Sequence, residues 1–146
     1  MYPDPRAIKF IDENFLPVKI HIKEQPETFK RFGTQWTPTL VILDAAGVER
    51  YRFEGFLPTE EFLAQLELGL AKSAFAREKW TEAEQRYRTL VEHYPNAETA
   101  AEALYWAGVS KYKASGDASA LSETASEFQK RYSVSVWAKK ASVWAA

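Results

Sequence analysis

The chain has 146 residues and a formal net charge of −1, from 19 basic and 20 acidic side chains. Because basic residues are not in excess, neither nucleic acid nor an anionic membrane surface is expected as a partner. The 46% of hydrophobic residues is typical of a globular chain with a core of its own. The absence of cysteine excludes thiol–disulfide chemistry within these residues.

The sequence has no segment suited to a membrane. Its apolar runs, such as Leu40 to Leu43, are far shorter than the stretch of about 20 residues that crosses a bilayer. The N-terminal residues show neither the charged nor the apolar region of a signal peptide. A cytoplasmic location is therefore expected.

Proline usage divides the chain into two parts. Six of the seven prolines lie before Gly69 and only Pro95 follows it, and strand-like runs end at the same place. The boundary is predicted near residues 58–75. This gives a first domain over residues 1–70 and a second over residues 71–146.

The first part is predicted to contain short helices and strands. Helices are expected over residues 5–14 and 27–32, the second ending at Gly33. Apolar and polar residues alternate over residues 15–22, which predicts a half-buried strand. The apolar members of this alternation are Leu16, Val18, Ile20 and Ile22.

A hairpin is expected next. The uncharged run over residues 39–43 predicts a strand covered on both faces. A turn at residues 44–47 separates it from an alternating strand over residues 49–55, so the two strands should pair antiparallel. Together with residues 15–22, this predicts a sheet of about three strands.

The second part is predicted to be helical and to contain a repeat. The first of its helices carries an apolar stripe at Phe62, Leu66, Leu70 and Phe75. In the second and fourth helices, apolar residues recur at the same spacing, and Tyr94 matches Tyr132, 38 residues later. The second copy is degenerate, because Leu121 replaces the small residue Ala83. Gly108 lies where two helices would cross. The spacing resembles the tetratricopeptide repeat, whose usual period is about 34 residues. A helical tail without repeat ancestry would show similar spacing.

The order of elements around Trp36-Thr37-Pro38-Thr39-Leu40 resembles the C-terminal half of the thioredoxin fold. The match covers about residues 5–75: short helix, glycine, this turn, a hairpin and a final helix. The resemblance implies that Pro38 is cis and that Trp36, Thr37 and Pro38 line a peptide-binding groove. The expected fold class is α/β plus all-α: a truncated thioredoxin-like three-layer fragment, then a tetratricopeptide-like antiparallel helical array.

The predicted function is binding of protein or peptide partners, as a non-catalytic, chaperone-like adaptor. The turn also suits a purely structural role, as a rigid bend with Trp36 in the core.

The only two histidines, His21 and His93, have no ligand cluster around them, so no metal, cofactor or catalytic residue is assigned. One alternative is the C-terminal fragment of a thioredoxin-family oxidoreductase whose Cys-x-x-Cys lies upstream. Another is a homodimer formed through exposed sheet edges.

Overall fold

The structure, a computed structural model, describes residues 4–145 and begins with two short helices. Helix α1 spans Pro5–Asn14 and starts at Asp4, whose carboxylate accepts a hydrogen bond from the Arg6 N–H at 2.8 Å. Helix α2 spans Pro26–Arg31. Gly33 follows it with a positive φ of 60°, a conformation that glycine adopts without strain. Both helices and this glycine agree with the sequence prediction.

The predicted hairpin is confirmed. Strand β1 (Thr39–Leu43) pairs antiparallel with strand β2 (Glu49–Glu54), with Thr39 opposite Glu54. The turn between them is held by one Asp44 carboxylate oxygen, which accepts hydrogen bonds from the N–H groups of Ala46 at 2.9 Å and Val48 at 3.0 Å.

The strand predicted over residues 15–22 is wrong. This segment is irregular, and its Leu16 and Val18 side chains are 92% and 75% exposed. Within residues 4–145 the sheet has two strands rather than about three, because residues 15–20 make no backbone hydrogen bond to β1 or β2. Strand β1 is also covered on one face rather than two, since Ile42 is buried while Leu43 is 41% exposed.

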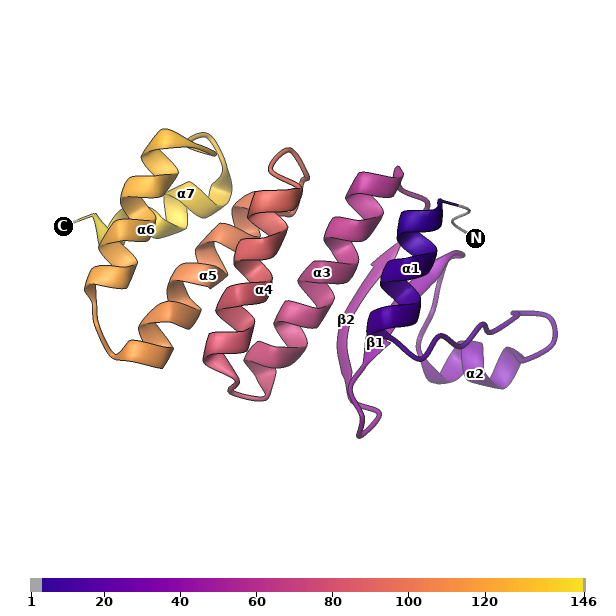
Figure 1. Ribbon diagram of the computed structural model, residues 1–146. Helices are drawn as coiled ribbons and strands as arrows, with labels where there is room; N and C mark the ends of the chain where they lie inside the picture. The colour runs from indigo at the N-terminus through magenta and orange to yellow at the C-terminus, as the bar shows by residue number, and fades with distance from the viewer. Residues whose placement is uncertain (1–3, 146) are drawn as a thin grey trace.

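Five helices and a final 3₁₀ turn complete the described chain in an antiparallel array (Figure 1). They are α3 (Thr59–Ala76), α4 (Trp80–His93), α5 (Ala100–Ser115), α6 (Ser119–Lys130), α7 (Val136–Ala141) and η1 (Ser142–Trp144). Each helix packs on the next one along the chain, as in a solenoid. None of the helices described has both the length and the hydrophobicity needed to cross a membrane.

Helix α3 joins the two parts of the molecule because it is buried on two sides. One side packs through Phe62, Leu63 and Leu66 into a first core with α1 and the sheet. The other side packs through Ala64, Leu68 and Ala71 into the core of the array. Figure 1 shows α3 between the sheet and α4. The fold is thus a small thioredoxin-like α/β portion continuous with a helical array.

Candidate functional site

The three residues singled out by sequence, Trp36, Thr37 and Pro38, form the bend that leads into β1. The Pro38 carbonyl accepts a hydrogen bond from the Gly55 N–H at 2.8 Å. The Thr39 hydroxyl donates to the Trp36 carbonyl at 2.7 Å. The peptide bond between Thr37 and Pro38 is cis. The bend is therefore fastened to the hairpin on both sides of Thr37.

The Trp36 side chain lies outside the core, with 65% of its surface exposed. A rigid bend with Trp36 in the core is therefore not what the structure contains. Thr37 is exposed as well, and Pro38 is half-buried. A single exposed aromatic side chain is common on protein surfaces, so the question is whether a second apolar side chain accompanies Trp36 there.

A second exposed aromatic residue, Phe56, was not found by the sequence reasoning. Its side chain is 73% exposed. It directly follows Gly55, which bonds to Pro38, so both aromatic residues stand at the same end of the hairpin. The signal available in the sequence was the position of Phe56 directly after the strand predicted over residues 49–55. We call Trp36, Thr37, Pro38 and Phe56 the turn surface.

A charged residue in the middle of β2 is already engaged in the fold. Arg52 of β2 donates to the Phe32 carbonyl at 2.6 Å and pairs with Glu49 at 2.5 Å. The hydrogen bond from Arg52 lowers the pKa of the Glu49 carboxyl group. Arg52 thus ties the segment after α2 to the sheet, and the turn surface offers aromatic rings and backbone groups rather than acid–base chemistry. Within residues 4–145, no group of three His, Cys, Asp or Glu side chains could hold a metal ion.

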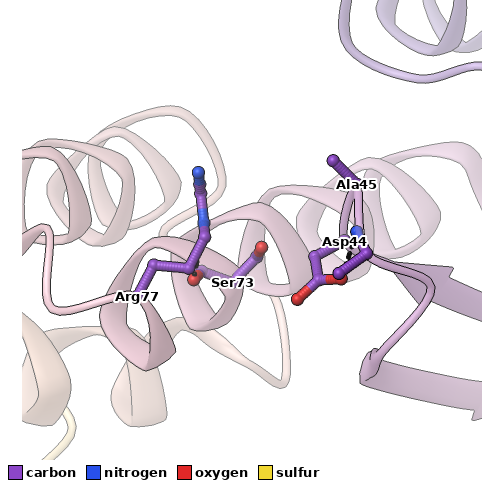
Figure 2. Close-up of a pocket in the computed structure, with 5 residues that line it drawn as sticks. Asp44, Ala45, Ser73 and Arg77 are labelled. Atoms are coloured by element: carbon purple, nitrogen blue, oxygen red, sulfur yellow. Dashed lines mark hydrogen bonds between the residues drawn. The ribbon is translucent and has the colours of Figure 1, made fainter.

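A hollow of about 330 Å³ lies between the hairpin turn and the end of α3, lined by Asp44, Ala45, Ala46, Ser73 and Arg77 (Figure 2). Its polar groups serve the fold. Asp44 holds the turn and pairs with Arg50 at 2.8 Å, and these hydrogen bonds lower the pKa of its carboxyl group. Arg77 donates to the Ser73 carbonyl at 3.2 Å. We assign this hollow no chemical role.

The aromatic residues of the array serve packing. Tyr105 of α5 stacks on Trp144 at a centroid distance of 4.6 Å and contacts Trp137 at 5.3 Å. Both tryptophans therefore pack on the core of the array. The turn surface remains the better candidate for binding.

Two family models match the chain. Residues 2–70 match a family described as a thioredoxin-like domain, and residues 58–128 match a family described as an outer membrane lipoprotein. The chain is thus similar to a thioredoxin-like portion followed by a helical repeat region. The two matches overlap over residues 58–70, which include the first turns of α3. The domain boundary predicted at residue 70 is not tested by these matches. No curated protein and no solved structure matches the chain.

Proposed function

We propose that this chain is a cytoplasmic, non-catalytic protein-interaction module that binds an extended peptide segment at the turn surface. The observation that carries the proposal is the exposed Trp36 side chain on a bend anchored by two hydrogen bonds. Tryptophan is among the residues that most often dominate binding energy at protein interfaces. The similarity to thioredoxin-like domains adds support.

The geometry favours an extended partner segment. Among residues 4–145, no backbone hydrogen bond engages Thr37, which lies between the two anchored positions. A peptide running past Thr37 could therefore gain backbone hydrogen bonds while apolar side chains cover Trp36 and Phe56. Because the bend is already fastened, binding would cost little ordering of this chain.

The helical array supplies a second surface in this proposal, which makes the chain an adaptor. Its similarity to a helical repeat region supports an interaction role, since solenoids present long exposed faces to partners. Self-association through the sheet edge is a further part of the proposal. A chaperone-like role follows if the bound segment belongs to an unfolded protein.

An oxidoreductase role is the competing proposal, supported by the same thioredoxin-like match. The 146 residues contain no cysteine, so that activity would need cysteines supplied from outside them. Insulin reduction by dithiothreitol tests the point. Acceleration by this chain alone would contradict the non-catalytic reading.

Binding can be tested with carboxymethylated α-lactalbumin, a permanently unfolded polypeptide, by isothermal titration calorimetry. We expect Trp36→Ala and Phe56→Ala each to weaken binding by about 10-fold or more, as for an interface hot spot. Pro38→Ala should weaken binding too. Val143→Ala, at a 77% exposed side chain on η1, is the control and should leave affinity unchanged. Equal losses in Trp36→Ala and Val143→Ala, or no binding by the wild type, would contradict the proposal.

A further inference from the structure

The two outer edges of the hairpin differ in charge. Four of the six residues of β2 are charged, and none of the five residues of β1 is. Charged residues on an edge strand oppose pairing with another chain, and an uncharged edge lacks this protection. The residues of β2 concerned are Glu49, Arg50, Arg52 and Glu54. The edge of β2 is therefore guarded, while the edge of β1 is open to pairing.

The hydrogen-bond phase of the hairpin shows which groups line the open edge. The Gly55 N–H donates to the Pro38 carbonyl, so residue 38 and, by alternation, residues 40 and 42 bond inward to β2. The N–H and C=O groups of Thr39, Val41 and Leu43 therefore point outward. Within residues 4–145, no strand receives them.

We propose that β1 pairs antiparallel with β1 of a second copy of this chain, about a two-fold axis at Val41. The two hairpins then form one four-stranded sheet in the order β2, β1, β1, β2. The inference deepens the proposed interaction role, on which it rests, but it uses the strand edge and not the turn surface.

The axis at Val41 satisfies the hydrogen-bond phase. It places Val41 opposite Val41 of the second copy and Thr39 opposite Leu43, so that the outward-directed residues form the hydrogen-bonded pairs. Leu40 and Ile42 then face each other as a non-hydrogen-bonded pair. An axis between two residues would instead place outward-directed groups opposite groups that already bond to β2. An axis at Leu40 or Ile42 would keep the phase but pair only three of the five residues of β1, whereas the axis at Val41 pairs all five. An isologous interface needs this kind of self-complementarity.

The side chains on both faces also match. On the face covered by α1 and α3, Leu40 would lie beside Ile42 of the second copy and extend the first core. On the other face, Leu43, now 41% exposed, would pack near Thr39 of the second copy. Pairing brings no like charges together, because β1 has none.

Sedimentation velocity on the whole chain at about 5 µM and about 500 µM tests the proposal, because dimerisation follows mass action. We expect dimer at the higher concentration. Val41→Lys and, as a second variant at a more exposed position, Leu43→Lys should each raise the dimer dissociation constant by about 10-fold or more, because lysine guards an edge. Val48→Lys, in the hairpin turn at a 46% exposed side chain, is the matched control and should dimerise like the wild type.

A wild type that stays monomeric at about 500 µM would overturn the proposal. So would dimerisation that survives both edge variants, or that Val48→Lys abolishes equally. Circular dichroism confirms that each variant is folded. The two sites are separable, because Trp36→Ala should leave the dimer intact and Leu43→Lys should leave binding of carboxymethylated α-lactalbumin intact.

Discussion

Gly108 of α5 and Thr124 of α6 touch so closely that the contact leaves no space for a side chain on the glycine. A Cβ atom at position 108 would lie 2.2 Å from the Thr124 hydroxyl oxygen and 2.8 Å from its Cβ. Thr124 is buried, and its hydroxyl donates to the Ala120 carbonyl at 2.7 Å. The small residue predicted at this crossing thus sets the approach of the second helix pair.

Gly108→Ala should destabilise the protein. Overpacking a closely fitted contact costs about 1–3 kcal/mol, while alanine recovers up to about 1 kcal/mol as the better helix former. We expect a net loss of about 1–2 kcal/mol in the free energy of unfolding, because Thr124 is fixed by its Cβ and its hydroxyl bond. Urea denaturation followed by circular dichroism measures it.

Gly69→Ala is the matched control, on α3. Its Cβ would lie 2.1 Å from Ile42 Cδ1, but that atom is the far end of a flexible side chain that can move aside. The loss at Gly69 should therefore be smaller than at Gly108. The close crossing would be refuted if both alanine variants were as stable as the wild type.

Local patterns predicted most of the elements, and tertiary context decided the rest. The hairpin followed from an uncharged run, a turn and an alternating run, all close together in the chain. The alternation over residues 15–22 is as regular, yet it forms no strand, because the segment does not pair with the open edge of β1 and local alternation cannot specify such tertiary pairing. Sequence periodicity shows which side chains share a face but not whether a neighbour exists.

The double role of α3 shows a second limit of prediction from sequence. Its residues Phe62, Leu66, Leu70 and Phe75 indicate one apolar stripe, as for a helix on a surface. In the structure ten of its 18 residues are buried, because the sheet packs on one side and α4 on the other. The packing of distant segments likewise decides which side chains form the turn surface. The sequence leaves Trp36 open to a groove or a core position and gives no role to Phe56, and only the fold shows that both side chains are exposed.

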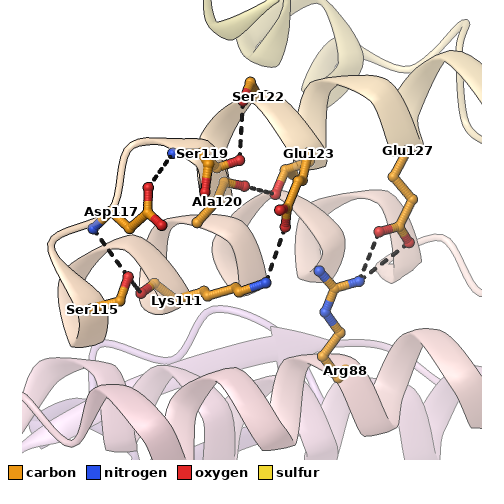
Figure 3. A network of polar contacts seen from close by, with 10 residues as sticks. Arg88, Lys111, Ser115, Asp117, Ser119, Ala120, Ser122, Glu123 and Glu127 are labelled. Carbon is orange, nitrogen blue, oxygen red and sulfur yellow. Dashed lines mark hydrogen bonds and ion pairs between the residues drawn. The ribbon is translucent and has the colours of Figure 1, made fainter.

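The ion pair between Arg88 of α4 and Glu127 of α6 connects the two helix pairs of the array (Figure 3). Arg88 Nη1 lies 2.9 Å and 3.2 Å from the two carboxylate oxygens. Because both side chains are about 30% exposed, water screens the attraction. A double-mutant cycle with alanine at both positions should give a coupling energy of only about 0.2–1 kcal/mol, which falls as salt is added.

Lys111 and Glu123, also in Figure 3, are the comparison pair for this cycle. Their side chains are 44% and 62% exposed, so their coupling should be the weaker of the two. A coupling at Lys111–Glu123 equal to that at Arg88–Glu127 would show that exposure does not govern these contacts.

Glu67 of α3 should make stability depend on pH. Its side chain is 5% exposed, and burial raises the pKa of its carboxyl group despite the opposing effects of Arg86, 3.5 Å away, and of His93. A folded-state pKa above the unfolded value of about 4.3 means a contribution to stability that is full below that value and lost as pH rises through the folded pKa. Glu67→Gln removes this titration.

The measurement is the free energy of urea unfolding for wild type and Glu67→Gln at about pH 4 and about pH 7. The wild type should lose stability relative to the variant as the pH rises between these values, because only the wild type must then bury a carboxylate. Glu82→Gln is the control: it removes the other carboxylate paired with Arg86, at 3.6 Å, and should leave the trend in place. If instead the wild type gained on Glu67→Gln with rising pH, the attraction to Arg86 would outweigh the cost of burial.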